Sequence, residues 1–252
     1  MAINYYWSVQ DKTIVITGCV PVLEVDYVNF LLCRGAKCVA LLDNEGTPET
    51  GSKAVAEVLN RIHTDKVVFI ECDVNNEEDL TKAFEAVLSQ FKQIDLIINI
   101  AGLNFSSARG PYEVNWQSMG FLTRKAIEHM RIDEGGKGGI ILNIVPLIGC
   151  VQFPHKIEMI HFSQCLAMDF YENTLVKVMT MCLGPSDSRD VFESSSYESN
   201  LDKIEIYMAA RCFLEMFENG TPGSIWMTMD NNPVKDLTPN IDSVFIKLLG
   251  SL

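Results

Sequence analysis

The chain has 252 residues, of which 48% are hydrophobic and 21% are charged, and its formal net charge is −13. This composition is that of a globular protein rather than a disordered one, and we predict a single domain over residues 1–252. The acidic balance argues against nucleic acid or an anionic membrane as the main partner, because both require a basic face. No stretch has the roughly 20 apolar residues of a membrane-spanning helix, and the first ten residues lack a secretory-signal pattern.

The chain contains eight cysteines and four histidines, and none of them has the spacing of a metal site. Most of the cysteines lie in apolar runs. We therefore predict reduced thiols, no metal and a cytoplasmic location. The cysteines are Cys19, Cys33, Cys38, Cys72, Cys150, Cys165, Cys182 and Cys212.

Short apolar runs alternate along the chain with longer segments of helical period. The runs predict strands at residues 13–17, 37–42, 66–72, 96–100, 140–144, 176–183 and 223–229. The longer segments predict helices at residues 25–34, 50–63, 77–91, 115–131, 155–172 and 203–218. Strands rich in Val and Ile without alternation are buried on both faces, so we predict an α/β, doubly wound fold with a seven-stranded, mostly parallel sheet and helices on both faces. Ligands of such folds bind beyond the carboxyl ends of the strands.

Several pieces match, in order and spacing, the motifs of one family. They are Thr17-Gly18 through Gly35-Ala36-Lys37, Asp43, Cys72-Asp73-Val74, Asn99-Ile100-Ala101-Gly102, Asn115, Gly138 to Asn143, and Gly223 to Met229. Over nearly its whole length the chain resembles the short-chain dehydrogenase/reductase family, closest to the branch of 15-hydroxyprostaglandin dehydrogenases and insect alcohol dehydrogenases. The resemblance implies a Rossmann fold, an NAD cofactor and the oxidation of an alcohol CH–OH group.

The glycine loop departs from the family pattern TGxxxGxG, in which glycines let backbone amides approach the pyrophosphate. Thr17 and Gly18 are kept, but Val22 and Glu24 stand at the other two glycine positions and Pro21 removes an N–H donor. Val22 adds a branched side chain and disfavours a positive φ. A carboxylate about 4 Å from a phosphate charge costs about 4 kcal/mol at an effective dielectric near 20. We expect NAD, if it binds, to bind weakly. In the alternative interpretation this turn simply packs, with Glu24 solvated in the first helical turn.

The remaining cofactor positions are kept. The resemblance implies that Asp43 would hydrogen-bond the adenosine ribose, which favours NAD over NADP. It also implies that Asp73 and Val74 flank the adenine. Asn99, Ala101 and Gly102 match a motif that braces the sheet as well as the cofactor, so these residues also have a purely structural interpretation. A strand-end turn would likewise explain Asp43.

The catalytic positions are depleted. The resemblance implies a Ser, a Tyr and a Lys four residues after the Tyr, with an Asn that anchors a proton-relay water. Asn115 and Lys156 match the Asn and the Lys. Pro146 stands at the Ser position and Gln152 at the Tyr position, and no tyrosine occurs between Tyr112 and Tyr171.

The family also builds a dimer from the helices predicted at residues 115–131 and 155–172. The second of these is apolar around much of its circumference, which indicates burial by the core and by a partner subunit. We predict a homodimer. Its apolar residues are Ile157, Met159, Ile160, Phe162, Leu166, Met168 and Phe170.

These observations leave the enzymatic status of the chain open between two hypotheses. In the first, it is a non-catalytic or strongly impaired relative that acts as a dimeric binding or structural protein, for a protein partner or a small apolar ligand. In the second, it is an NAD(H)-dependent oxidoreductase of altered mechanism that acts on an alcohol. The joint replacements at the glycine loop and at the Ser and Tyr positions favour the first.

Overall fold

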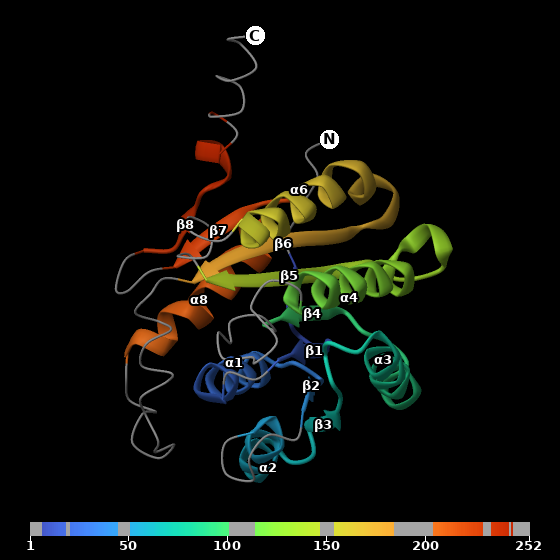
Figure 1. Ribbon diagram of the computed structural model, residues 1–252. Coiled ribbons are helices and arrows are strands. Elements are labelled where there is room, and N and C mark those ends of the chain that lie inside the picture. Colours follow the sequence, from blue (N-terminus) through green and yellow to red (C-terminus); the bar gives the residue numbers. More distant parts are fainter. Residues whose placement is uncertain are drawn as a thin grey trace.

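The structure of the chain is a computed structural model (Figure 1). It describes residues 7–18, 21–44, 51–100, 114–146, 154–183, 204–228, 233–241 and 243. Several predicted site positions, among them Ala101, Gly102 and Gln152, lie outside these described residues.

Strands and helices alternate along the chain. The strands are β1 (Thr13–Thr17), β2 (Cys38–Asp43), β3 (Val67–Glu71), β4 (Leu96–Asn99), β5 (Gly139–Pro146), β6 (Val176–Leu183), β7 (Ile225–Thr228) and β8 (Lys235–Asp236). The helices are α1 (Pro21–Cys33), α2 (Ser52–His63), α3 (Glu77–Phe91), α4 (Val114–Met130), α6 (Pro154–Thr174) and α8 (Ile204–Asn219), with a 3-10 turn η1 (Ile132–Glu134) after α4.

The strands form one sheet in the order β3-β2-β1-β4-β5-β6-β7-β8. The first seven strands pair in parallel, which is the doubly wound arrangement that the sequence predicted. The predicted count of seven strands was wrong by one, because β8 pairs antiparallel with β7 at the edge. This strand has two exposed, charged residues and therefore no apolar run that could indicate it.

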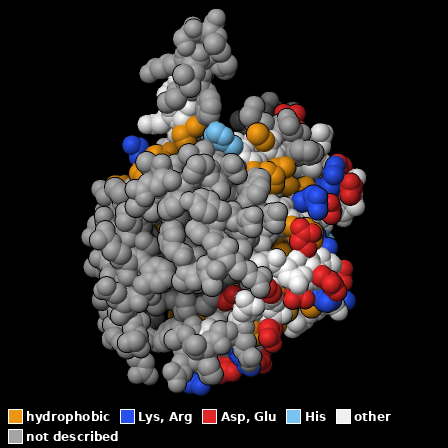
Figure 2. Space-filling model, in the orientation of Figure 1, with side chains coloured by type: hydrophobic (Ala, Val, Ile, Leu, Met, Phe, Trp, Pro, Cys, Tyr) orange, Lys and Arg blue, Asp and Glu red, His pale blue; other side chains and the backbone are white. Residues whose placement is uncertain are grey.

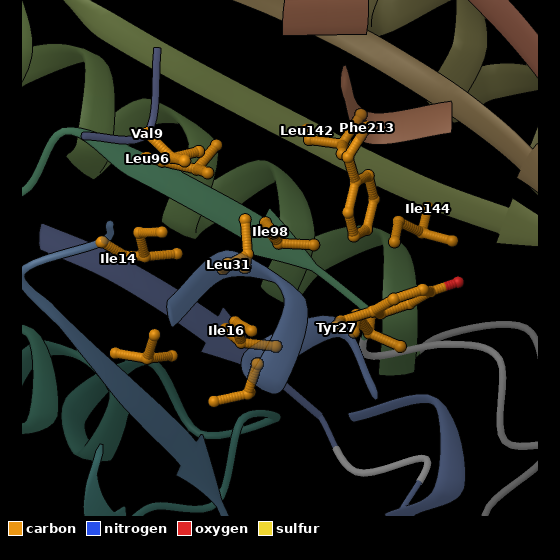
Figure 3. Packing of buried hydrophobic residues seen from close by; sticks show 14 of the residues in the cluster. Val9, Ile14, Ile16, Tyr27, Leu31, Leu96, Ile98, Leu142, Ile144 and Phe213 are labelled. Atoms are coloured by element: carbon orange, nitrogen blue, oxygen red, sulfur yellow. The ribbon is translucent and has the colours of Figure 1, made fainter. Parts of the chain in front are cut away.

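Helices cover both faces of the sheet. The core on one face is formed with α1, α2 and α8, and Figure 3 shows Tyr27 and Phe213 of this cluster beside Ile98 and Ile144 of the sheet. The core on the other face is formed with α3, α4 and α6. The central strands between them are buried from both sides, and every residue of β1 and β6 is buried. This double burial explains why the strand sequences are continuously apolar.

The predicted bounds agree with the structure where apolar periodicity is unbroken. The bounds of β1, β6 and α3 are as predicted. Helix α1 begins at Pro21 rather than at residue 25. The second and third glycine positions of the family pattern, which hold Val22 and Glu24, therefore lie inside its first turn. Proline suits the first position of a helix because the N–H it lacks has no partner within the helix.

A basic side chain is buried within the sheet. Lys177, near the start of β6, is 3% exposed and donates from Nζ to the carbonyl oxygen of Gly220 at 2.9 Å, just beyond the end of α8. A cation at the carboxyl end of a helix is favoured by the helix dipole. Burial lowers the pKa of Lys177 to about 8.

We expect this buried lysine to make stability rise with pH between about 8 and 10.5. Its folded pKa lies below its unfolded value, so the folded protein releases the proton first and gains up to about 3 kcal/mol as the pH increases through this range. Chemical denaturation at several pH values checks this. The quantity to follow is the difference in the free energy of unfolding between wild type and Lys177→Met. The difference is needed because burial also raises the pKa of Cys72, to about 12, and that group acts in the opposite direction. A difference that does not change from pH 8 to pH 10 would contradict the assignment.

Candidate functional site

The exit of β1 begins the candidate site. Gly18 follows the strand with φ +80°, a conformation that favours glycine, and its N–H donates to the carbonyl oxygen of Leu42 on β2 at 3.1 Å. Helix α1 then holds Val22 and Glu24 in its first turn. Because Val22 is part of a right-handed helix, our expectation that it would suffer from a positive φ was wrong. The bulk of the Val22 side chain and the negative charge of Glu24 oppose a diphosphate whatever the value of this φ.

The carboxylate of Asp43 lies at the end of β2, as predicted, and is already engaged. The fully buried Ser52, which begins α2, donates from Oγ to Asp43 Oδ2 at 2.9 Å. The backbone of Asp43 accepts a hydrogen bond from the N–H of Cys72 after β3. The carboxylate therefore has a structural role in joining β2 to α2.

The predicted adenine-flanking residues also have local roles. Asp73 Oδ1 accepts from the N–H of Asn75 at 3.0 Å, and its carbonyl accepts from the N–H of Asn76, which caps α3. Val74 is 8% exposed and belongs to the core under α3 and α4. The structure thus places both residues beyond β3, where their turn and core contacts account for them.

The corner formed by the ends of β2 and β3 is negatively charged. The pKa of the buried Cys72 thiol is raised to about 12, first by burial and then by the carboxylates of Asp79, Asp73 and Asp43. Figure 2 shows further Asp and Glu side chains on the surface around α3. A ligand with a negative charge would therefore meet an unfavourable field at this corner.

A buried polar chain crosses the carboxyl ends of the central strands. Thr17 Oγ1 donates to Asn99 Oδ1 (3.2 Å), Asn99 Nδ2 donates to Asn143 Oδ1 (2.8 Å), and Asn143 Nδ2 donates to Ser163 Oγ (2.9 Å). Asn99 Nδ2 also reaches Thr123 Oγ1 of α4 at 3.5 Å. All five residues are at most 2% exposed. The chain ties β1, β4 and β5 to α4 and α6, so Asn99 braces the sheet whether or not a cofactor binds.

Three of the predicted catalytic positions lie on described elements. Pro146 is the last residue of this strand and pairs with Leu183 of β6. Asn115 is the second residue of α4 and Lys156 the third of α6, although their side chains lie outside the described part. Tyr171 lies on the same helix as Lys156, fifteen residues later and roughly 22 Å along its axis. It cannot form the Tyr–Lys pair.

The described residues contain no group of three or more His, Cys, Asp or Glu that could hold a metal ion. Within the same residues, no helix is long and apolar enough to cross a membrane. The described cysteines are thiols that form no disulfide, namely Cys33, Cys38, Cys72, Cys165, Cys182 and Cys212.

A family model described as short chain dehydrogenase matches residues 12–198. The chain belongs to the short-chain dehydrogenase family. The 15-hydroxyprostaglandin dehydrogenase of Bos taurus, whose name specifies NAD(+), is 29% identical over 209 residues, which cover 79% of this chain and 77% of the relative. Alcohol dehydrogenase 1 of Ceratitis capitata is 27% identical over 191 residues, 72% of each chain.

A solved member of the fold aligns over most of the chain. The 3-ketoacyl-(acyl-carrier-protein) reductase from Brucella melitensis, complexed with NADH, has a TM-score of 0.67 at 19% identity and covers 89% of this chain and 99% of its own. The family and the branch inferred from the motifs are thereby confirmed. The named activities of short-chain dehydrogenase relatives are oxidoreductions.

Proposed function

We propose that this short-chain dehydrogenase is a non-catalytic or strongly impaired member of its family that acts as a dimeric binding or structural protein. The observation that carries the proposal is Pro146 at the end of β5, where the family pattern has a serine. Proline has no hydroxyl to hold a substrate oxygen. The Tyr position holds Gln152, and the nearest later tyrosine, Tyr171, is too far along α6 to replace it.

The residues present do not fit the diphosphate of a dinucleotide. Pro21 removes an amide donor at the amino end of α1, and Val22 and Glu24 occupy the following turn in place of glycines. The acidic corner of Asp43 and Asp73 adds to the repulsion. By contrast, Gly18 is kept, and the resemblance gives Asp43 the role of hydrogen-bonding an adenosine ribose. We therefore propose weak binding of NAD, with NADP excluded by the Asp43 carboxylate.

The second candidate function is an NAD(H)-dependent oxidoreductase that acts on an alcohol CH–OH group. It is favoured by the activities that its relatives' names give and by the retained Asn115 and Lys156. This candidate needs a different proton donor from the family's tyrosine. General acid–base catalysis typically contributes 10²–10⁴-fold to the rate. The loss of the tyrosine is therefore by itself a large obstacle to turnover.

The dimer that we propose uses α4 and α6. On α6, Ile160 and Phe162 pack into a core cluster, while His161 and Cys165 are exposed. The helix is thus only partly covered by its own subunit. A second copy, another protein or a small apolar ligand are the partners that this surface suggests, and the reduced cysteines of the described part fit a cytoplasmic protein.

An assay of NADH production from NAD⁺ and a panel of secondary alcohols tests the proposal. We expect no turnover above that of the buffer. Lys156→Met should then change nothing, as should the control variant Lys137→Met. NAD⁺-dependent turnover that is lost in Lys156→Met and kept in Lys137→Met would establish the second candidate instead.

A further inference from the structure

A row of lysines lies at the amino edge of the sheet, opposite the candidate site. Each of the first five strands is preceded within four residues by a lysine, and because these strands are parallel their amino ends meet at one edge. In the order β3-β2-β1-β4-β5 the row reads Lys66, Lys37, Lys12, Lys92 and Lys137.

Backbone hydrogen bonds hold neighbouring members of the row together. The N–H of Lys37 donates to the carbonyl oxygen of Lys12 at 2.9 Å, and the N–H of Val39 donates to that of Lys66 at 2.8 Å. Adjacent strands lie about 4.8 Å apart, so the five positions span about 20 Å. That length corresponds to about six residues of an extended peptide.

Four of these lysines have no acidic partner among the residues that the structure describes. Lys37, Lys66, Lys92 and Lys137 are exposed, and within the described ranges they form no ion pair. Lys12 differs, since its Nζ lies 3.6 Å from Asp95 Oδ1. In a chain with 33 acidic and 20 basic residues, unpaired lysines gathered on one edge are a local reversal of the overall charge.

Paired cations elsewhere show the contrast. Lys82 on α3 lies 2.9 Å from Glu78, and Arg131 after α4 lies 2.6 Å from Asp133 and 3.1 Å from Glu134. Exposed carboxylates on α3 and after α4 therefore pair with Lys82 and Arg131, and the four lysines of the row have no such pair within the described residues.

A cavity of about 330 Å³ opens at one end of the row, between the ends of α3 and α4 and the start of β5. Lys92 and Lys137 both line it, together with Gln93 and His129. Two acidic residues line it as well: Glu134 is bound by Arg131, and Glu128 is exposed. Because Glu134 is paired with Arg131, the two lysines outnumber the remaining acidic residue of the lining, Glu128, and the cavity is suited to a carboxylate.

We propose that this amino edge, defined by Lys66, Lys37, Lys92 and Lys137, binds an extended acidic peptide segment of a partner protein, with one Asp or Glu side chain in the cavity. A peptide fits this edge better than a nucleic acid does. Asp11 and Asp65 interrupt the edge, and a peptide can turn its flexible acidic side chains away from them, whereas a polyphosphate chain carries its charges on the backbone itself. The proposal does not depend on the catalytic status of the chain.

Fluorescence anisotropy with a labelled polyglutamate peptide tests it at low ionic strength. Each interaction of two charges at about 4 Å in water corresponds to about a fivefold change in affinity, so Lys92→Met/Lys137→Met should weaken binding by about 20-fold. Lys37→Met/Lys66→Met should also weaken it. The control Lys82→Met, which removes a lysine already paired on α3, should leave the affinity unchanged.

Three results would overturn the proposal. They are no binding of the peptide at low ionic strength, an equal loss of affinity in Lys82→Met, and tighter binding of a single-stranded oligonucleotide of the same charge. Binding that weakens with added salt and with the row variants alone would support it.

Discussion

A chain with glycine in place of both Val22 and Glu24 is expected to bind NADH about 100- to 1000-fold more tightly than wild type. The substitutions remove a branched side chain and a carboxylate from the first turn of α1, where the family's diphosphate approaches the backbone. Titration of NADH against tryptophan fluorescence measures the change. Glu24→Gln alone isolates the charge and should recover part of the gain.

A matched control separates this effect from helix weakening. Glu57 and Val58 are exposed on α2, and Glu57→Gly/Val58→Gly introduces the same two glycines at a distance from β1. Both double variants should lose about 1 kcal/mol of stability in total, since glycine has a helix propensity roughly 0.5 kcal/mol poorer than that of valine or glutamate at each position. Only the α1 variant should gain affinity. An equal gain in the α2 variant, or none in either, would contradict the role given to the α1 turn.

Replacing Asn143 by leucine is expected to lower the free energy of unfolding by about 3–4 kcal/mol. The substitution keeps the approximate size of the side chain, but it removes the hydrogen bond that Asn99 Nδ2 donates to Asn143 Oδ1 and the one that Asn143 Nδ2 donates to Ser163 Oγ, so that Asn99 Nδ2 keeps the longer contact with Thr123 at 3.5 Å. Each buried polar group that loses its hydrogen bond costs about 1–3 kcal/mol. For a chain of this length, the melting temperature should fall by roughly 10 °C.

The exposed Asn219 provides the control for this prediction. Its side chain bonds Glu215 at 3.2 Å on the surface of α8, so Asn219→Leu should change stability by less than about 0.5 kcal/mol. Because Asn143 and Ser163 are in direct contact, the effects of Asn143→Leu and Ser163→Ala should not add. Additive effects, or a loss below about 1 kcal/mol in Asn143→Leu, would show that the polar chain is not a structural brace.

The fold was predictable because the sequence patterns that indicate its strands and helices lie within each element. Continuous apolar strands and helical periodicity sufficed for β1, β6 and α3, whose bounds agree with the structure. The start of α1 was placed too late because Pro21 reads as part of a loop until its helical position is known. The two-residue β8 carries no apolar signal, and its pairing with Trp226 and Met227 depends on tertiary contact.

The candidate site was predictable only in part. The strand-end positions of Asp43 and Asn99 followed from topology, since carboxyl ends of parallel strands share one edge. The hydrogen bonds from Ser52 to Asp43 and from Asn143 to Ser163 did not, because they join elements whose relative register the sequence does not encode locally. Buried polar residues at the ends of apolar strands are the signal that could have indicated the Asn99–Asn143 pair.

The most direct measurement for the account as a whole is the affinity of the wild-type protein for NADH, read from energy transfer to the bound coenzyme from Trp7, Trp116 and Trp226. With Pro21, Val22 and Glu24 at the start of α1, we predict no saturable binding at NADH concentrations below about 1 mM. A dissociation constant of that size corresponds to a binding free energy of about 4 kcal/mol at most. Micromolar binding, with the coenzyme retained through purification, would contradict the account and restore the case for an active dehydrogenase.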